Sequence, residues 1–416
     1  MTQDIIATLR QEARHTLENN ILPFWNEMAD YSRGGFYGRR DGHGVLHPDA
    51  EKGAVLNARI LWSYSAAYRV IGGDRNLQMA DRARDYILQH FIDTTHGGVF
   101  WSLNADGTPL DTKKQSYAIG FMIYAFSEYA LATGDENAKQ TAISLYRTLE
   151  AHAFDPVSGG YIEALTRDWQ PIDDMRLSDF DENASRTQNT HLHIIEPYTA
   201  LYRVWPDPAL RRAIVRLLHI FIDRLRNPLH NHIDLFFDEQ WRGRRDIQSF
   251  GHDIEASWLL HESALVLEEQ ENKQNPAEAT TPTEDPSARE ILRWLEPHIR
   301  AIASASRRGL LPNGAMRHEA RLDGTTADND LHWWVQCENI IGHLNLYQHF
   351  HDEAALRIAH DCWQWTTQNL IDHTHGEWHW SVRADGTLNR TDDKAGFWKC
   401  PYHNTRLCTE ILTRFP

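Results

Sequence analysis

Apolar positions along the chain alternate between a helical and a strand-like spacing. Leu56, Ile60, Leu61 and Tyr64 recur every three to four residues, and the stretch 121–129 repeats this spacing. Such a spacing places the apolar side chains on one face of a helix. Between the helical stretches lie short alternating segments such as 98–103. These segments are bounded by tight turns and predict small β-hairpins.

The same succession of a glycine-type turn, a second turn about ten residues later and a helical stretch occurs six times. The turn pairs are Gly34-Gly35 with Asp41-Gly42, Gly97-Gly98 with Asp106-Gly107, Gly159-Gly160 with Asp168-Trp169, Asn231-His232 with Glu239-Gln240-Trp241, Asn313-Gly314 with Asp323-Gly324, and His375-Gly376 with Asp385-Gly386. Successive units are mostly spaced by roughly 62 residues, which leaves room for two helices each. The pattern predicts an all-helical ring of six helical hairpins with short β-hairpins at one rim.

A repeat that runs from end to end favours one closed domain over residues 1–416. The segment 268–288 interrupts the rhythm, because it is polar, rich in proline and poor in apolar residues. This composition predicts a mobile surface loop, and it explains the longer spacing between the fourth and fifth units.

Composition narrows the classes of partner. With 41% hydrophobic and 24% charged residues, the chain has the composition of a folded, water-soluble protein. Its formal net charge of -16 repels nucleic acid phosphates and anionic lipid, so neither partner is expected. An uncharged small molecule is the expected ligand, and we expect a monomer or a weak dimer.

Targeting signals and disulfides are not expected. The segment 1–6 shows no basic region followed by an apolar core, and no stretch approaches the ~18 apolar residues of a membrane span. The four cysteines form no C-x-x-C pair, which favours reduced thiols and a cytoplasmic location. They are Cys337, Cys362, Cys400 and Cys408.

Polar and aromatic residues recur at a similar distance, about 19 to 33 residues, after each turn. They are Arg59, Tyr117, Asn189 with His193, His252 with Glu255, His332 with Trp333, and Trp398 with His403. In a ring of helical hairpins, one end of every inner helix points to a common centre. The pattern therefore predicts a pocket with apolar walls and a few convergent polar groups.

In two of these segments, helical spacing indicates which polar side chains lie on the same face as a candidate histidine. Glu255 lies three residues after His252, so its carboxylate could orient that imidazole or raise its basicity. Asn189 and His193 share a helical face that His191 does not, which favours His193 as the functional histidine. Pro197 complicates this motif, because a proline seven residues into a helix breaks or kinks it. The helix could therefore begin after the motif.

Arg59 and His403 lie in contrasting surroundings. Arg59 is a cation amid apolar residues, so its guanidinium either snorkels to the surface or faces a polar cavity. His403 follows Pro401, a residue suited to a helix start. Trp333 and Trp334 point about 100° apart on a helix, so we expect at least one of them to flank the cavity, where an aromatic face suits a sugar ring.

Two other uses of these residues remain open. The pairs His191-x-His193, His230-x-His232 and His373-x-His375 are weak metal signals, because none has the His-Glu-x-x-His pattern, and no catalytic metal is expected. Helical rings also host glycoside hydrolases that use two carboxylates, for which Glu255 and Glu338 are candidates. Histidines outnumber acids at the convergent positions.

Together, the segments 56–62, 189–193, 249–258, 332–334 and 397–404 are similar to the motifs of the N-acylglucosamine 2-epimerase superfamily, and within it to the enzymes that act on cellobiose. The resemblance covers nearly the whole chain. It implies an (α/α)6 barrel and epimerisation at carbon 2 of the reducing-end glucose of a β-1,4-linked disaccharide, cellobiose or lactose, without a cofactor.

The resemblance also implies roles for individual residues. His252 and His403 correspond to the acid/base pair, His193 to a third histidine that supports ring opening or the enediolate, and Arg59 to the group that stabilises the developing oxyanion. The remaining residues of the implied sugar site are Tyr117, Asn189, Glu255, Trp333, Glu338 and Trp398.

Chemistry requires the same set of groups. Removal of a proton alpha to a carbonyl needs a base within reach and a positive group for the oxyanion, and inversion needs a second acid on the opposite face. Pro197, the segment 268–288 and Cys400 depart from the family pattern. The alternatives are a monosaccharide 2-epimerase or isomerase of the same superfamily, a glycoside hydrolase, and a noncatalytic carbohydrate-binding protein.

Overall fold

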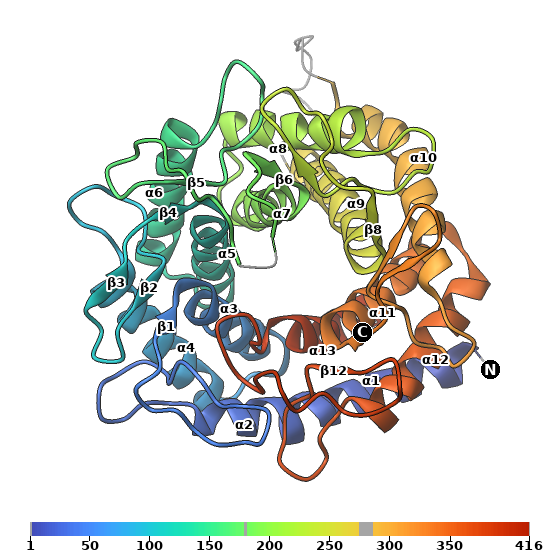
Figure 1. Ribbon diagram of the computed structural model, residues 1–416, viewed down its shortest axis with the longest axis horizontal. Helices are drawn as coiled ribbons and strands as arrows, with labels where there is room; N and C mark the ends of the chain where they lie inside the picture. The colour runs from blue at the N-terminus through green and yellow to red at the C-terminus, as the bar shows by residue number, and fades with distance from the viewer. Residues whose placement is uncertain (1, 179–180, 274–285, 416) are drawn as a thin grey trace.

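The helices of the computed structural model, which describes residues 2–178, 181–273 and 286–415, form two concentric rings (Figure 1). The inner ring consists of α3 (Ala54–Ile71), α5 (Ser116–Thr133), α7 (Gln188–Val204), α9 (Phe250–Lys273), α11 (Trp333–Phe350) and α13 (Tyr402–Arg414). The outer ring consists of α1 (Thr2–Thr16) with α2 (Leu22–Glu27), α4 (Asp74–Tyr86), α6 (Glu136–His152), α8 (Pro208–Ile220), α10 (Ala288–Ser306) and α12 (Glu353–Asn369). Each outer helix is followed by an inner one, which confirms the expected (α/α)6 barrel.

The two ends of the chain close the ring. Each inner helix contacts the next, and the last inner helix, α13, contacts the first, α3. α1 packs against α12 and α13. Two indole nitrogens strengthen this closure: Trp363 Nε1 donates to Glu12 Oε2 at 2.6 Å, and Trp25 Nε1 donates to Glu377 Oε2 at 2.5 Å.

Burial explains which helices lie inside. In α5 every residue from Ser116 to Ala130 is buried, as expected for a helix that is apolar on all sides. In α8 the buried positions include Leu210, Ile214, Leu217 and Leu218, a single stripe at helical spacing. The outer helices therefore cover the inner ring with one face and present the other to water.

The repeated turns require left-handed backbone. Gly35 has a φ of +61°, and a Cβ added there would lie 2.6 Å from the Tyr86 ring. In the fourth unit Asn231 adopts this conformation with a φ of 60°, which asparagine tolerates better than most residues. In the first unit the second turn lies where it was expected, because the Gly44 N–H donates to the Asp41 carbonyl at 2.9 Å and Gly44 supplies the left-handed residue.

Short antiparallel strands join consecutive units at one rim. The strands are β1 (Lys52–Gly53), β2 (Ser102–Leu103), β3 (Pro109–Asp111), β4 (Lys114–Gln115), β5 (Ala164–Leu165), β6 (Arg186–Thr187), β7 (Phe236–Phe237), β8 (Ile247–Ser249), β9 (Glu319–Arg321), β10 (Thr326–Asp328), β11 (Leu331–His332) and β12 (Ser381–Val382). β2–β3 and β9–β10 are hairpins within a unit, whereas β1–β2, β4–β5, β6–β7, β8–β9 and β11–β12 link neighbouring units. Most of the strand pairs at the rim therefore connect one unit to the next.

The start of the loop predicted over 268–288 is wrong, because it was placed too early in the sequence. Helix α9 continues to Lys273, and a capping box at Ser287 starts α10 at Ala288. Residues 274–285 lie outside the described residues. The polar composition of 268–273 is compatible with the end of a helix, because the side chains at 271–273 are exposed to water.

Two further expectations concern the whole chain. All four cysteines are buried and free, in agreement with the expected absence of disulfides. Among the described helices, none combines the length and the apolar character needed to span a bilayer.

One buried histidine makes the stability of the fold depend on pH. His191 Nδ1 lies 2.7 Å from the Thr187 carbonyl oxygen, and its Nε2 accepts the Tyr161 backbone N–H at 3.0 Å. Burial lowers the pKa of His191 to about 4, so the folded state holds the neutral ring. Its stabilising contribution is complete above pH 6.5 and is lost as the pH falls towards 4. Urea unfolding at pH 7.5 and pH 5 should show a loss of about 2 kcal/mol from this residue.

The matched variant is His191→Gln, which keeps an acceptor for Tyr161 but does not titrate. We expect it to be less stable at pH 7.5 and to lose about 2 kcal/mol less than the wild type on acidification. An equal loss in both proteins would mean that His191 is not the source of this pH dependence.

Candidate active site

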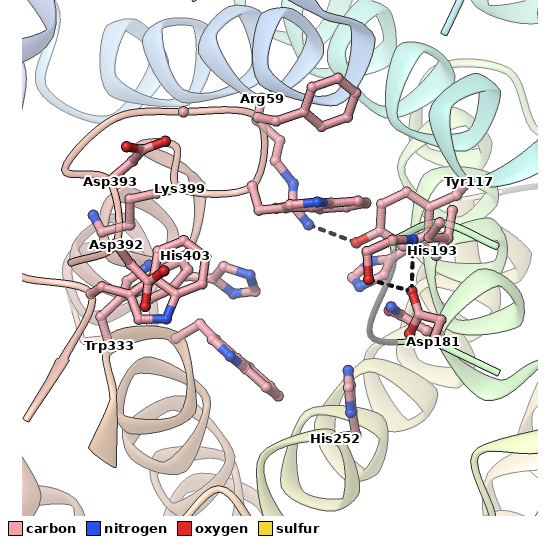
Figure 2. Close-up of a pocket in the computed structure, with 18 of the residues that line it drawn as sticks. Arg59, Tyr117, Asp181, His193, His252, Trp333, Asp392, Asp393, Lys399 and His403 are labelled. Carbon is pink, nitrogen blue, oxygen red and sulfur yellow. Dashed lines mark hydrogen bonds between the residues drawn. The ribbon is translucent and has the colours of Figure 1, made fainter. Parts of the chain in front are cut away.

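A cavity of about 470 Å³ opens at the strand-bearing rim, and the first turns of the inner helices form much of its wall. Figure 2 shows the side chains that surround it, with Arg59, His193, His252 and His403 on different sides of the open centre. Nine of the ten expected site residues line it: Arg59, Tyr117, Asn189, His193, His252, Glu255, Trp333, Trp398 and His403. The tenth, Glu338, is fully buried and contacts His403 from behind.

Arg59 supplies positive charge without a paired carboxylate. Its Nη2 donates to the Tyr117 hydroxyl at 2.9 Å and its Nη1 to Cys400 Sγ at 3.4 Å. The guanidinium lies over the Phe121 ring at 4.1 Å, and the side chain is buried. Within the described residues Arg59 forms no ion pair, so its charge is available to an anion that develops in the cavity. Arg59 therefore faces a polar cavity, the second of the two alternatives.

Carboxylates fix two of the histidines. His403 Nδ1 lies 2.8 Å from Glu338 Oε1, and His193 Nδ1 lies 2.9 Å from Glu196 Oε2. A carboxylate at Nδ1 selects the tautomer that carries its proton there. The Nε2 lone pair of each imidazole is then free to act as a base.

A kink in α7 positions His193. The helix begins at Gln188, before the motif, and its backbone departs from helical geometry at His193, with φ −88° and ψ 20°. Pro197 has no N–H to bond the His193 carbonyl. That oxygen faces Gly120 of α5, where an added Cβ would lie 2.2 Å from it. The proline therefore accompanies a kink at His193 and does not delay the start of the helix.

His252 differs from the other two histidines in its partner. Its Nδ1 lies 3.0 Å from Ser249 Oγ, and its ring lies 4.7 Å from that of Trp334. The expected pairing with Glu255 is wrong, because Glu255 Oε1 accepts from Arg406 Nη2 at 2.7 Å. The nearby guanidinium competes successfully for the carboxylate.

All three histidines favour the neutral form. Burial lowers the pKa of His403 well below its usual value, and Arg59 and Arg406 lower it further. Burial likewise lowers the pKa of His252 strongly and that of His193 despite the Glu196 carboxylate. At neutral pH each is therefore a base that does not need to lose a proton first.

Arg406 is the hub of a buried network beneath the cavity. Its Nη2 donates to Glu255 Oε1 at 2.7 Å and to Glu338 Oε1 at 2.6 Å, and its Nη1 donates to Glu196 Oε1 and to the Tyr402 hydroxyl. Glu338 and Glu196 in turn hold His403 and His193. One guanidinium thus connects the partners of two histidines on different helices.

Three carboxylates around one guanidinium cannot all remain ionised at little cost. Burial and the neighbouring Glu338 raise the pKa of Glu255 well above its usual value. Although burial opposes it, Arg406 and His193 hold the pKa of Glu196 at about 2. Of these two acids, Glu255, which lines the cavity, takes up a proton more readily than Glu196 and can then donate a hydrogen bond to a bound hydroxyl.

Tryptophans form the apolar walls. Trp333, Trp334, Trp380 and Trp398 all line the cavity. The Trp333 and Trp380 rings lie 4.8 Å apart at 55°, and Trp334 lies 5.8 Å from His403. Both adjacent tryptophans flank the cavity, so the expectation of at least one is confirmed. Such walls suit the apolar faces of a sugar.

The sequence reasoning missed Arg406, Glu196 and Tyr402. A signal for two of them was present, because Glu196 and Arg406 each lie three residues after a candidate histidine. The three-residue spacing was used to predict a partner only for His252, and the predicted pairing with Glu255 does not occur. Trp380, Asp181 and Asp392 also line the cavity and come from rim segments that no helical pattern identifies.

The histidines of the His-x-His pairs have other contacts in the structure. His191 is used in backbone hydrogen bonds, and His232 Nε2 lies 2.8 Å from Asp234 Oδ1. Among the residues that the structure describes, none of the three pairs joins a group of three possible ligands.

Comparison with known proteins identifies the family. The sequence profile of the N-acylglucosamine 2-epimerase (GlcNAc 2-epimerase) family matches residues 35–406. A cellobiose 2-epimerase from Bacteroides fragilis is 50% identical over 405 residues, which cover 97% of this chain and 98% of the relative.

Solved structures agree with this match. The structure of cellobiose 2-epimerase from Bacillus thermoamylovorans has a TM-score of 0.88 and 34% identity, and the alignment covers 98% of this chain and 100% of the other. A GH76 alpha-mannanase from Bacteroides thetaiotaomicron has a TM-score of 0.62 at 12% identity over 97% and 95% of the chains, so it shares the fold alone. The chain belongs to the N-acylglucosamine 2-epimerase family.

Proposed function

We propose that the protein is a carbohydrate 2-epimerase that interconverts the glucose and mannose configurations at the reducing end of cellobiose and related β-1,4-linked disaccharides such as lactose. One observation carries the proposal: His252 and His403, neutral imidazoles from α9 and α13, face a cavity whose guanidinium, Arg59, has no carboxylate partner in the described residues. The similarity to cellobiose 2-epimerases supports the choice of substrate.

The residues divide the reaction between them. After ring opening, which His193 assists, one histidine removes the proton from carbon 2 of the open-chain sugar. Arg59, held by Tyr117, stabilises the enediolate oxygen. The second histidine, which takes up a proton from solvent for this step, returns it to the opposite face of carbon 2, and the configuration inverts. The first histidine then loses the abstracted proton to solvent, which restores both imidazoles.

The remaining lining residues bind the substrate. Glu255 offers its carboxyl group and Asn189 its amide to the sugar hydroxyls. Tyr117, Trp333 and Trp398 enclose the sugar rings. Glu338 has a different role from the expected one, because it contacts His403 and not the cavity. We assign it to positioning.

A glycoside hydrolase is less compatible with this arrangement. The two carboxylates considered for it, Glu255 and Glu338, both accept from Arg406, and only Glu255 lines the cavity. A hydrolase places its two acids on either side of the scissile bond. The pair here shares one side of the site.

Incubation of the metal-free protein with cellobiose in deuterated water tests the proposal. We expect the carbon-2 epimer of cellobiose to form, with deuterium at carbon 2 because the proton passes through a solvent-exchangeable base. Proton NMR measures both the product and the label. Release of glucose would support a hydrolase, and turnover restricted to mannose or N-acylglucosamine would contradict the proposed substrate class.

A further inference from the structure

Three side chains with metal-binding atoms meet at the rim, outside the set assigned to the reaction. We call His318, Asp328 and His332 the rim triad. His318 Nδ1 lies 2.9 Å from Asp328 Oδ2, and His332 Nε2 lies 3.1 Å from the same oxygen. The three residues come from the loop before β9, the end of β10 and the end of β11.

The spacing of the triad suits a metal ion. One ligand atom from each residue lies within 4.8 Å of the other two. Around an ion with bonds of about 2.0–2.2 Å, ligand atoms lie roughly 3.0–3.6 Å apart. The two imidazole rings lie side by side, with centroids 4.3 Å apart at 30°. A small closing movement would bring both nitrogens and the carboxylate onto one ion.

The backbone around the triad is fixed before any ion binds. The His318 carbonyl accepts the Phe250 N–H at 3.1 Å, and the His332 carbonyl accepts Gln336 Nε2 at 3.1 Å. Asp328 Oδ1 accepts the Asp330 N–H at 2.8 Å, which leaves Oδ2 for the histidines. Ligands held in this way lose little freedom on binding.

Among the described residues, two other groups of histidine and carboxylate side chains already contact a cationic side chain. Asp372 lies 3.3 Å from His375 Nδ1, and Lys394 Nζ occupies its Oδ2 at 2.5 Å. The carboxylates of the group Glu255, Glu338 and His403 both accept from Arg406. In the described ranges, by contrast, Asp328 pairs with no lysine or arginine. The rim triad alone among these three groups offers its carboxylate to an external cation.

The triad opens onto a second cavity of about 440 Å³. His252, Trp334, Trp380 and Asp392 line both this cavity and the catalytic one, so the two are adjacent compartments. An ion held by three protein ligands would keep its remaining positions open to this space.

We propose that His318, Asp328 and His332 bind a divalent transition-metal ion such as Zn²⁺, with its open coordination positions facing the cavity beside His252. Imidazole nitrogen with carboxylate oxygen favours zinc, cobalt or nickel over magnesium or calcium. The ion takes no part in the proposed reaction.

Titration of the metal-stripped full chain with Co²⁺, followed by visible absorption, and with Zn²⁺, followed by calorimetry, tests the site. We expect one ion per chain, with weak d–d bands and no strong thiolate charge-transfer band, because the four cysteines are buried elsewhere. Asp328→Asn, which keeps the shape of the side chain, and His318→Gln should each weaken binding at least about 10-fold.

His375→Ala is the matched control, because it removes a histidine from an aspartate that a lysine already neutralises, and it should leave binding unchanged. Circular dichroism confirms that each variant is folded. No bound ion in the wild type, or equal affinity in the wild type and both triad variants, would overturn the proposal and leave a hydrogen-bonded rim group. Binding is measured without turnover, so this result is independent of the proposed epimerase activity.

Discussion

Replacing His403 by asparagine should lower kcat on cellobiose by about 10³-fold, and His252→Asn should do the same. Asparagine places an amide nitrogen near the position of Nδ1, so the contact with Glu338 or Ser249 can persist while the Nε2 base is lost. Because the fold contacts are kept, the melting temperature should change little. Steady-state kinetics and thermal unfolding check both expectations.

Isotope exchange separates the two histidines. If each removes the carbon-2 proton from one epimer, each variant keeps one base and can exchange deuterium into only one of the two epimers. His252→Asn and His403→Asn should therefore label opposite epimers in deuterated water. His373→Asn, a change at an exposed histidine, is the control and should label both. Undiminished turnover in either variant would remove that histidine from the acid/base pair.

The repeat made most of the fold predictable. Turn residues such as Gly35 and Gly98 have no substitute that adopts their backbone as easily, so the period remains visible in the sequence. The same period placed Arg59, His193, His252 and His403 at one rim, because every inner helix starts there. Sequence patterns within one unit were sufficient to predict the position of a residue wherever the structure of that unit alone determines it.

Interactions between units were not predictable in this way. Glu255 was assigned to His252 on its own helix, yet the structure pairs it with Arg406 of α13. Helical spacing describes which residues share a face, but it does not say which distant guanidinium reaches that face. The rim strands present the same limit, since most of them pair with a strand of the next unit.

Arg406→Gln should have a large effect on both stability and activity. It leaves Glu196, Glu255 and Glu338 buried without their cation, and breaking a buried ion pair on one side typically costs about 3–5 kcal/mol. We also expect kcat to fall by about 10²-fold, because His403 and His193 lose the carboxylate geometry that fixes their tautomers. Urea unfolding and steady-state kinetics measure the two effects.

A pH profile distinguishes positioning from a purely structural role. In the wild type Arg406 contributes to the lowered pKa values of His403 and His193, so the acid limb of kcat/KM should lie below pH 6.5. Removing the charge in Arg406→Gln should move this limb to higher pH, because protonated imidazole is no longer repelled. Arg406→Lys keeps the charge but cannot reach three carboxylates at once, so it should lose activity without moving the limb. If the acid limb of kcat/KM stays in place in Arg406→Gln, Arg406 stabilises the barrel without changing the pKa values of the histidines. If the limb moves to higher pH, this one buried guanidinium sets the protonation of two bases on separate helices.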